Sequence, residues 1–280
     1  VRQYLRDIGE YDNTLIMFAS DNGLSDPAES PLDIPLEEQE GIPPQEIEEF
    51  SASTNNTVPN IGNASSNVGY GWRGSVMSAS PLSGLKATQF EGGTRAPFII
   101  REPSPADTAL VQGTDALSEK VDIIRANVRV TDMTPTFLEY AGVQHPGETY
   151  QGKSIHPPTG KSIKPLLEGA VQQVHSDDEV LSQELFGNIA AYMGEWKALK
   201  QTFPNGTGEW RLFNLAQDVT EDIRSDLSEQ YPDVLNKMVS SYESFAKEVG
   251  IIPPQFDLES QESYEEPFGN ETQIFAPITD

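Results

Sequence analysis

Residues 12–23 read Asp12-Asn13-Thr14-Leu15-Ile16-Met17-Phe18-Ala19-Ser20-Asp21-Asn22-Gly23, an apolar run that passes directly into a polar turn. The uninterrupted apolar residues 15–19 predict a strand that is buried on both faces. A helical pattern over residues 1–11 precedes this strand. Because a helix followed by a fully apolar strand is typical of a parallel sheet covered by helices, we expect the chain to open inside an α/β layer structure.

The turn Asp21-Asn22-Gly23 follows the strand at its carboxyl end, where ligands bind in open α/β sheets. Asp21 offers a charged oxygen and Asn22 a neutral carbonyl oxygen, while Gly23 allows a turn tight enough to bring both round one ion. Ligation by oxygen alone suits Ca²⁺ or Mg²⁺ better than zinc. The same residues also fit an ordinary turn whose side chains cap their own backbone, which is the more frequent case for three residues alone.

A second polar segment occupies residues 84–97, Gly84-Leu85-Lys86-Ala87-Thr88-Gln89-Phe90-Glu91-Gly92-Gly93-Thr94-Arg95-Ala96-Pro97. Gly92 and Gly93 permit a close approach of backbone, and Lys86 supplies a point charge suited to a tetrahedral oxyanion. Arg95 can act in the same way or pair with a carboxylate. A single lysine is usually a solvated surface group, so the spacing alone does not decide between these functions.

Composition excludes several classes of protein. The 280 residues carry a net charge of −26, which repels phosphate backbones and argues against a nucleic-acid binder. That acidity fits a solvated surface, or alternatively a surface that collects cations. The chain has no cysteine, which excludes thiolate zinc sites and cysteine nucleophiles within it. Its longest apolar run is far shorter than the roughly 20 residues of a transmembrane helix, so we expect no membrane span.

The pattern predicts three parts. Residues 1–170 form an α/β domain, residues 171–252 a small α+β subdomain, and residues 253–280 an acidic tail. Within the first part, residues 26–68 are acidic and then rich in Pro, Ser and Asn, which predicts a long surface insertion. Thr131 or Asp132 is expected to cap a helix over residues 131–142.

The predicted subdomain begins with four short strands at residues 180–185, 190–193, 196–200 and 210–214. A helix over residues 232–249 follows, with its apolar residues at i, i+3, i+4 and i+7 spacing. The economical arrangement is a small antiparallel sheet packed against that one helix.

Four groups of residues carry a family resemblance when they are taken together. They are residues 12–23; Lys86 with residues 92–97; residues 130–138 with 141–143; and residues 195–197, 210–215 and 218–221. In this order they resemble the type I, formylglycine-dependent sulfatases, of arylsulfatase-like type, from residue 1 to about 250. The chain is similar to the C-terminal portion of such a protein.

This resemblance implies an alkaline-phosphatase-like sheet with helices on both faces, incomplete at its N-terminus, plus the small antiparallel sheet. It implies hydrolysis of a small-molecule sulfate monoester, with aryl sulfates as the expected class, and a bound Ca²⁺, with Mg²⁺ as the alternative. Asp21 and Asn22 would ligate the ion, with Asp21 also placed to orient a formylglycine hydroxyl. Lys86 would bind a sulfate oxygen.

The chain departs from the family pattern in its nucleophile. No Cys or Ser stands in the x-Pro-x-Arg context that yields formylglycine, so this group is expected in the missing N-terminal part, and the fragment alone should be inactive. His145, His156 and His175 match no catalytic position and are interpreted as surface or loop residues. Most family members act outside the cytoplasm, so a periplasmic or extracellular location is expected, although the chain itself shows no signal segment.

Two alternatives stay open at this point. Phosphonate and phosphate ester hydrolases of the same superfamily use a similar metal turn and lysine. A non-catalytic protein of the same fold, used for binding, would carry the same pattern without the chemistry.

Overall fold

The computed structural model describes residues 1–25, 45, 55–66, 71–103, 123–202 and 206–252. The chain divides into two compact units, one of residues 1–20 with 97–179 and one of residues 21–96 with 180–280. Most of the predicted insertion at 26–68 lies outside the described residues, as does the acidic tail at 253–280. Within the insertion, residues 55–66 include the short 3-10 helix η2 (Val58–Asn60).

The predicted strand at residues 15–19 is confirmed as β1 (Ile16–Ala19), which is part of the first unit. It pairs with β2 (Phe98–Arg101) in a two-stranded sheet, with Ile16 opposite Arg101 and Ala19 opposite Phe98. The pairing is antiparallel, so the expectation of a parallel arrangement is wrong for this pair.

Burial of β1 also differs from the expectation. Phe18 in β1 is 67% exposed and Ile99 in β2 is 66% exposed. Among the described residues β2 is the only strand that pairs with β1, so the apolar side chains of this pair gain little cover from the sheet itself. An apolar run indicates burial only where a second layer covers the strand.

The helices of the first unit are short. The predicted helix at residues 1–11 is reduced to α1 (Arg2–Asp7), because Gly9 adopts a left-handed φ of 76°. The 3-10 helix η1 (Tyr11–Asn13) follows. Further along the chain lie the remaining elements of this unit: η3 (Val130–Asp132), α5 (Met133–Tyr140), β3 (Thr149–Tyr150), β4 (Lys153–Ser154) and α6 (Lys164–Leu167).

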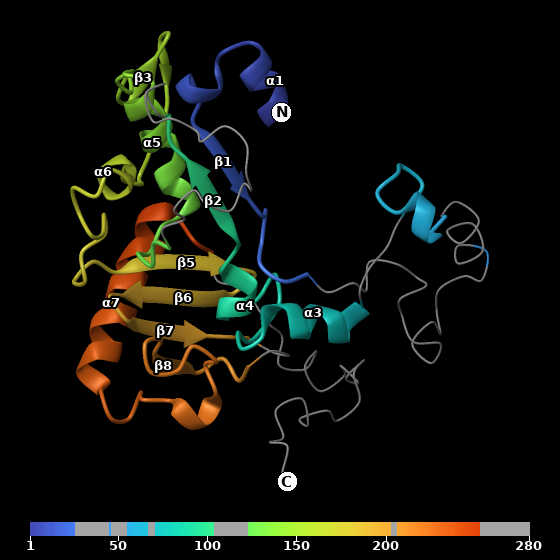
Figure 1. Cartoon of the computed structure of the whole chain (residues 1–280). Coiled ribbons are helices and arrows are strands. Elements are labelled where there is room, and N and C mark those ends of the chain that lie inside the picture. The colour runs from blue at the N-terminus through green and yellow to red at the C-terminus, as the bar shows by residue number, and fades with distance from the viewer. Residues whose placement is uncertain (26–44, 46–54, 67–70, 104–122, 203–205, 253–280) are drawn as a thin grey trace. The chain divides into compact units, whose positions relative to one another are not determined.

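The second unit contains the predicted antiparallel sheet. Its strands are β5 (Leu181–Leu185), β6 (Asn188–Met193), β7 (Trp196–Lys200) and β8 (Trp210–Asn214), paired in that order (Figure 1). The helix α7 (Pro232–Val249) runs alongside the sheet with the predicted bounds, and Gly250 ends it in the left-handed conformation. These local patterns are therefore confirmed.

The two faces of this sheet have different cover. On one face, Ala191, Ala198 and Leu212 pack with Met238 of α7. On the other face, Ala190, Leu199 and Phe213 are joined by Phe90, which comes from the glycine-rich segment at residues 84–97. That segment contains α4 (Glu91–Thr94), and the chain reaches it after α3 (Gly71–Ala79). The sheet thus acts as a platform for the segment that carries Lys86.

Beyond these elements the second unit contains the 3-10 helix η4 (Ile223–Ser225). Within the described part of the chain, every helix is too short or too polar to cross a lipid bilayer.

Candidate active site

The predicted metal turn is bound to the glycine pair through its backbone. Gly23 N donates to Gly93 O at 3.1 Å, and Leu24 N donates to Gly92 O at 2.8 Å. A Cβ added to Gly23 would lie 2.2 Å from Gly92 O, well inside van der Waals contact. Glycine is therefore required at position 23 for the two segments to approach each other.

The segment that carries Lys86 joins the same arrangement. Lys86 N donates to Leu24 O at 2.6 Å, so the backbone of the lysine contacts the residue that directly follows the turn. Asp21 is exposed, while Asn22 and Lys86 are half-buried. The structure thus brings the turn and the Lys86 segment together within one unit, which the sequence separates by more than sixty residues.

The glycine pair is itself tightly enclosed. Gly92 N donates to Ser83 O at 2.7 Å, and a Cβ on Gly92 would lie 2.5 Å from that oxygen. A Cβ on Gly93 would lie 2.2 Å from Leu85 O. The predicted close approach at Gly92 and Gly93 is thus one of backbone to backbone, and it fixes residues 83–85 against the helix α4.

The platform sheet holds the residues that follow Lys86. Ala87 adopts a left-handed φ of 71°, which is unusual for a residue with a Cβ. Its carbonyl accepts a hydrogen bond from Asn188 Nδ2 at 3.1 Å, and Gln183 Nε2 donates to the buried Gln89 Oε1 at 2.6 Å. Contacts from β5 and β6 therefore determine the backbone path next to Lys86.

A buried ionic cluster, absent from the predicted site, lies directly beside the glycine pair. Lys197 of β7 has no exposed surface, and its Nζ lies 2.9 Å from Glu91 Oε1 and 2.6 Å from Glu221 Oε1. Tyr192 donates its hydroxyl to Glu91 Oε1 at 2.9 Å. Arg95 lies 2.6 Å from Glu91 Oε2. Two roles were predicted for Arg95, binding an oxyanion or pairing with a carboxylate, and the structure shows the second.

The pKa values of Glu91, Glu221, Lys197 and Tyr192 are shifted in this cluster. Burial raises the pKa of Glu91, but the charge and hydrogen bond of Lys197, the charge of Arg95 and the Tyr192 hydrogen bond together lower this pKa below its ordinary value. Burial dominates at Glu221 and raises its pKa in spite of the same lysine. Burial would lower the pKa of Lys197, but the acidic groups around it raise this pKa above its ordinary value. Burial also raises the pKa of Tyr192 to about 12.

His175 lies in a loop, as one of the two expected interpretations has it, but it is buried and not on the surface. It is 9% exposed, and its Nε2 lies 3.0 Å from Oδ2 of the fully buried Asp132. The Asp132 side chain also accepts from Arg129 N at 2.8 Å and from Lys161 N at 2.9 Å. Of the two predicted caps, Asp132 occupies the N-cap position of α5, but its side chain makes no capping hydrogen bond there, because it binds the backbone before η3 and a neighbouring loop instead.

The donor set of the turn fits a hard cation only in part. Asp21 and Asn22 offer oxygen atoms, which are the ligands that Ca²⁺ and Mg²⁺ prefer. Within the described ranges no three His, Asp or Glu side chains lie close enough together to hold a metal. The described chain therefore offers two oxygen-bearing side chains at this turn, and an ion there would need further ligands from elsewhere.

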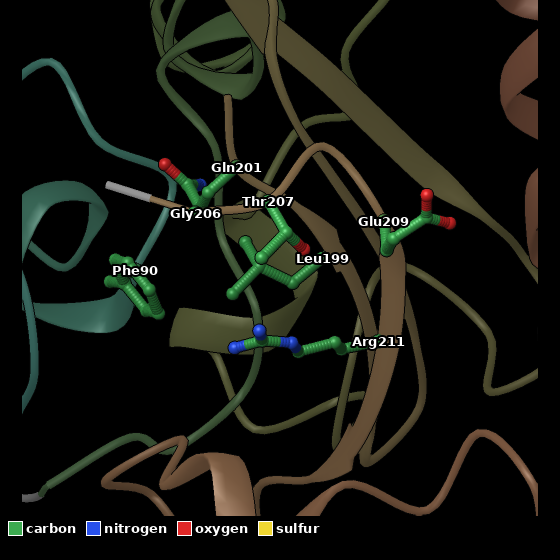
Figure 2. Close-up of a pocket in the computed structure, with 7 residues that line it drawn as sticks. All are labelled: Phe90, Leu199, Gln201, Gly206, Thr207, Glu209 and Arg211. Carbon is green, nitrogen blue, oxygen red and sulfur yellow. The ribbon is translucent and has the colours of Figure 1, made fainter. Parts of the chain in front are cut away.

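A separate shallow hollow lies on the second unit (Figure 2). Phe90, Leu199, Gln201, Gly206, Thr207, Glu209 and Arg211 line it. The side-chain amide of Gln201 is buried and has no hydrogen-bond partner among the described residues. Asp21, Asn22 and Lys86 do not line this hollow, so it is distinct from the candidate site.

Comparison with known proteins decides the family. The profile of the family described as Sulfatase matches residues 1–143, which include the turn, Lys86 and the glycine pair. The chain belongs to the sulfatase family. The match ends at Val143, close to the end of α5.

A relative agrees with this assignment, and a solved structure is similar in fold. An uncharacterized sulfatase from Schizosaccharomyces pombe is 33% identical over 259 residues, which cover 92% of this chain and 42% of the relative. The crystal structure of Ps i-CgsB is similar in fold, with a TM-score of 0.52 at 22% identity, over 93% of this chain and 42% of that one. This sulfatase chain thus spans about two fifths of the length of the proteins it matches.

Proposed function

We propose that the protein containing this chain hydrolyses sulfate monoesters, with aryl sulfates as the working substrate class. One observation carries the proposal: the hydrogen bond from Lys86 N to Leu24 O places the lysine segment directly against the Asp21–Asn22 turn. This contact supports the proposal, because it joins the backbone segments that carry a carboxylate, a carboxamide and an ammonium group in a chain of the sulfatase family.

The turn would hold part of a divalent cation site. Ca²⁺ is the favoured ion and Mg²⁺ the alternative, because Asp21 and Asn22 present oxygen atoms alone. Since Ca²⁺ takes about 6–8 oxygen ligands, most of its coordination would come from residues outside the described part of this chain. Asn22 adds a ligand without charge, which keeps the site cationic enough to attract an anionic ester.

The chain's own residues would bind and orient the substrate. The Lys86 ammonium would contact a sulfate oxygen and stabilise the negative charge that develops as the ester bond breaks. Asp21 would hold the ion and orient the nucleophile's hydroxyl. The cation and a formylglycine, which we place outside this chain, supply the Lewis acid and the nucleophile when they are present. The net reaction adds water across the S–O ester linkage and releases an alcohol or phenol, sulfate and a proton.

The nature of the substrate can be tested on the full-length protein. We expect it to cleave 4-nitrophenyl sulfate with a higher kcat/KM than 4-nitrophenyl phosphate, and to lose both activities when Asp21 is changed to Ala. A preference for phosphate would assign the protein to phosphate ester hydrolysis instead. Absence of turnover of either ester, in protein with a confirmed formylglycine, would favour a non-catalytic binding function.

A further inference from the structure

The buried ionic cluster is unusual because its central charge has no access to water. Lys197 is one of the largest fully buried side chains, and its Nζ lies between Glu91 and Glu221, which are 3% and 4% exposed. Lysine is almost never fully buried unless it is paired. Replacing such a pair with apolar residues is often neutral for stability, so stability alone does not explain why a protein keeps it.

Glu221 brings a second connection besides its ion pair. Its Oε2 accepts a hydrogen bond from the backbone Glu91 N at 2.6 Å. Glu221 adopts a left-handed φ of 54°, a conformation that disfavours residues other than glycine. The Asp218 carboxylate holds this turn by accepting from Thr220 N at 2.9 Å and from Asp222 N at 3.2 Å. An unfavourable backbone is thus fixed so that Glu221 can reach the start of α4.

The same turn also contacts the loop residues that precede Lys86. Ser83 Oγ donates to Thr220 O at 2.5 Å, and Ser83 O in turn accepts from Gly92 N at 2.7 Å. Residues 220–221 therefore hold the segment of residues 83–93 at both of its ends.

This segment leads directly to the candidate site. Gly92 and Gly93 follow Glu91 in the chain, and their carbonyls accept from Leu24 N and Gly23 N. A shift of Glu91 would pass to these carbonyls along the chain. The turn has little room to adapt, since a Cβ added to Gly23 would lie only 2.2 Å from Gly92 O. The path from Lys197 to Gly23 of the turn is one ion pair to Glu91, two peptide bonds to Gly93 and one backbone hydrogen bond.

We infer that Lys197 and Glu221 are positioning residues, which act through Glu91 to set the Asp21–Gly23 turn and the Lys86 segment in one fixed arrangement. The inference rests on the proposed function for its interpretation of Asp21 and Lys86. Sites of this kind require support that locks the ligating groups to within a fraction of an ångström, and a buried cluster of ion pairs supplies directional contacts that apolar packing does not.

The test uses the full-length protein with Lys197→Met, which keeps the length of the side chain and removes its charge. Calorimetric titration with Ca²⁺ and steady-state kinetics with 4-nitrophenyl sulfate are measured on the folded variant. We expect the Kd for Ca²⁺ to rise by about 10- to 100-fold, as is usual when support behind a ligand is removed. The kcat should fall by a similar factor, with a smaller change in KM.

Met238→Ala is the matched control. Met238 is fully buried, and it packs on the opposite face of the same sheet, away from the segment of residues 83–93. This variant should lower the melting temperature but leave the Kd for Ca²⁺ and the kcat close to the parent values. An equal loss of Ca²⁺ affinity in both variants would show a general effect of instability and overturn the inference.

A second variant covers the case in which Lys197→Met does not fold. Glu221→Gln removes one charge and keeps an acceptor for Glu91 N, so we expect a smaller change in the same direction. A folded variant at either position with unchanged Ca²⁺ affinity and kcat would contradict the inference. If neither variant folds, the cluster is an element of stability and the positioning role is wrong.

Asp21→Ala, titrated in parallel, separates this inference from the proposed function. If Asp21→Ala binds Ca²⁺ as the parent does, the assignment of the metal turn itself is wrong. If Asp21→Ala loses Ca²⁺ while the Lys197 and Glu221 variants retain it, the turn stands and only the positioning role is wrong.

Discussion

At the scale of single residues, the candidate site combines a charge with an unfavourable backbone. Lys86 is followed by Ala87 at a φ of 71°, and Asn188 Nδ2 binds the carbonyl of that alanine. A left-handed residue other than glycine costs about 1–2 kcal/mol. Residues held in such a conformation are frequent at functional sites, where the surrounding contacts maintain it. The strained position therefore agrees with a precise placement of Lys86.

The role of Lys86 predicts a loss of activity without a loss of fold. Lys86→Ala in the full-length protein should lower kcat/KM for an aryl sulfate by about 10²-fold or more, as expected for one lost charge partner of the transition state. Lys247→Ala is the control, since Lys247 is an exposed lysine near the end of α7 in the same unit. Equal kinetics for the parent and Lys86→Ala would place the sulfate contact elsewhere.

Glu91 predicts a pH dependence of stability. Its pKa is lowered in the folded protein, because the charges of Lys197 and Arg95 and the hydrogen bonds from Lys197 and Tyr192 together exceed the effect of burial. A carboxyl whose folded pKa is lowered adds stability above its unfolded pKa, near 4.5, and this contribution is lost as the pH falls below it. The melting temperature of Glu91→Gln should therefore lie furthest below that of the parent at pH 6–7. The difference should shrink towards pH 3–4, whereas a constant difference would show that the Glu91 charge does not contribute.

At the scale of elements, buried hydroxyl and carboxylate groups hold α5 in the first unit. Thr136 is fully buried on α5, and its Oγ1 donates to Asp132 O at 2.6 Å. The same oxygen accepts from Ile163 N at 2.9 Å. The hydroxyl therefore links the start of α5 to the residue that precedes α6.

Thr136→Val should destabilise the protein by about 1–3 kcal/mol, because it leaves Ile163 N buried without an acceptor. Thr134→Val is the control on the same helix, since Thr134 is exposed and its exchange should change stability by less than about 0.5 kcal/mol. Denaturant unfolding measures both changes. Similar midpoints for the two variants would show that the hydrogen bond to Ile163 N does not stabilise this unit.

Elements whose pattern is local were predictable from the sequence. The i, i+3, i+4 spacing of α7 gives its bounds, and the turn residues between β5 and β8 separate the strands correctly. The direction of the β1–β2 pair was not predictable, because it joins Ile16 to Arg101 across a long stretch of chain. The burial of His175 likewise depends on Asp132, a residue 43 positions away.

At the scale of the whole molecule, the site combines segments that lie far apart in the chain. The sequence indicates Asp21, Asn22 and Lys86 one by one, and the structure joins their segments through backbone hydrogen bonds. The sequence does not indicate the buried cluster, because Lys197 and Glu221 lie 106 and 130 positions from Glu91. In the sequence each of them resembles an ordinary surface charge. Pairing between such distant charges is visible only in the folded chain.

If the proposed function is right, the Asp21–Asn22 turn and Lys86 face one ion and one sulfate group. The most direct measurement is a crystal structure of the full-length protein with Ca²⁺ and sulfate bound. We expect Asp21 and Asn22 oxygens at about 2.3–2.6 Å from the ion, and Lys86 Nζ at about 2.7–3.2 Å from a sulfate oxygen. An ion bound away from the turn, or Lys86 directed away from the sulfate, would contradict the account.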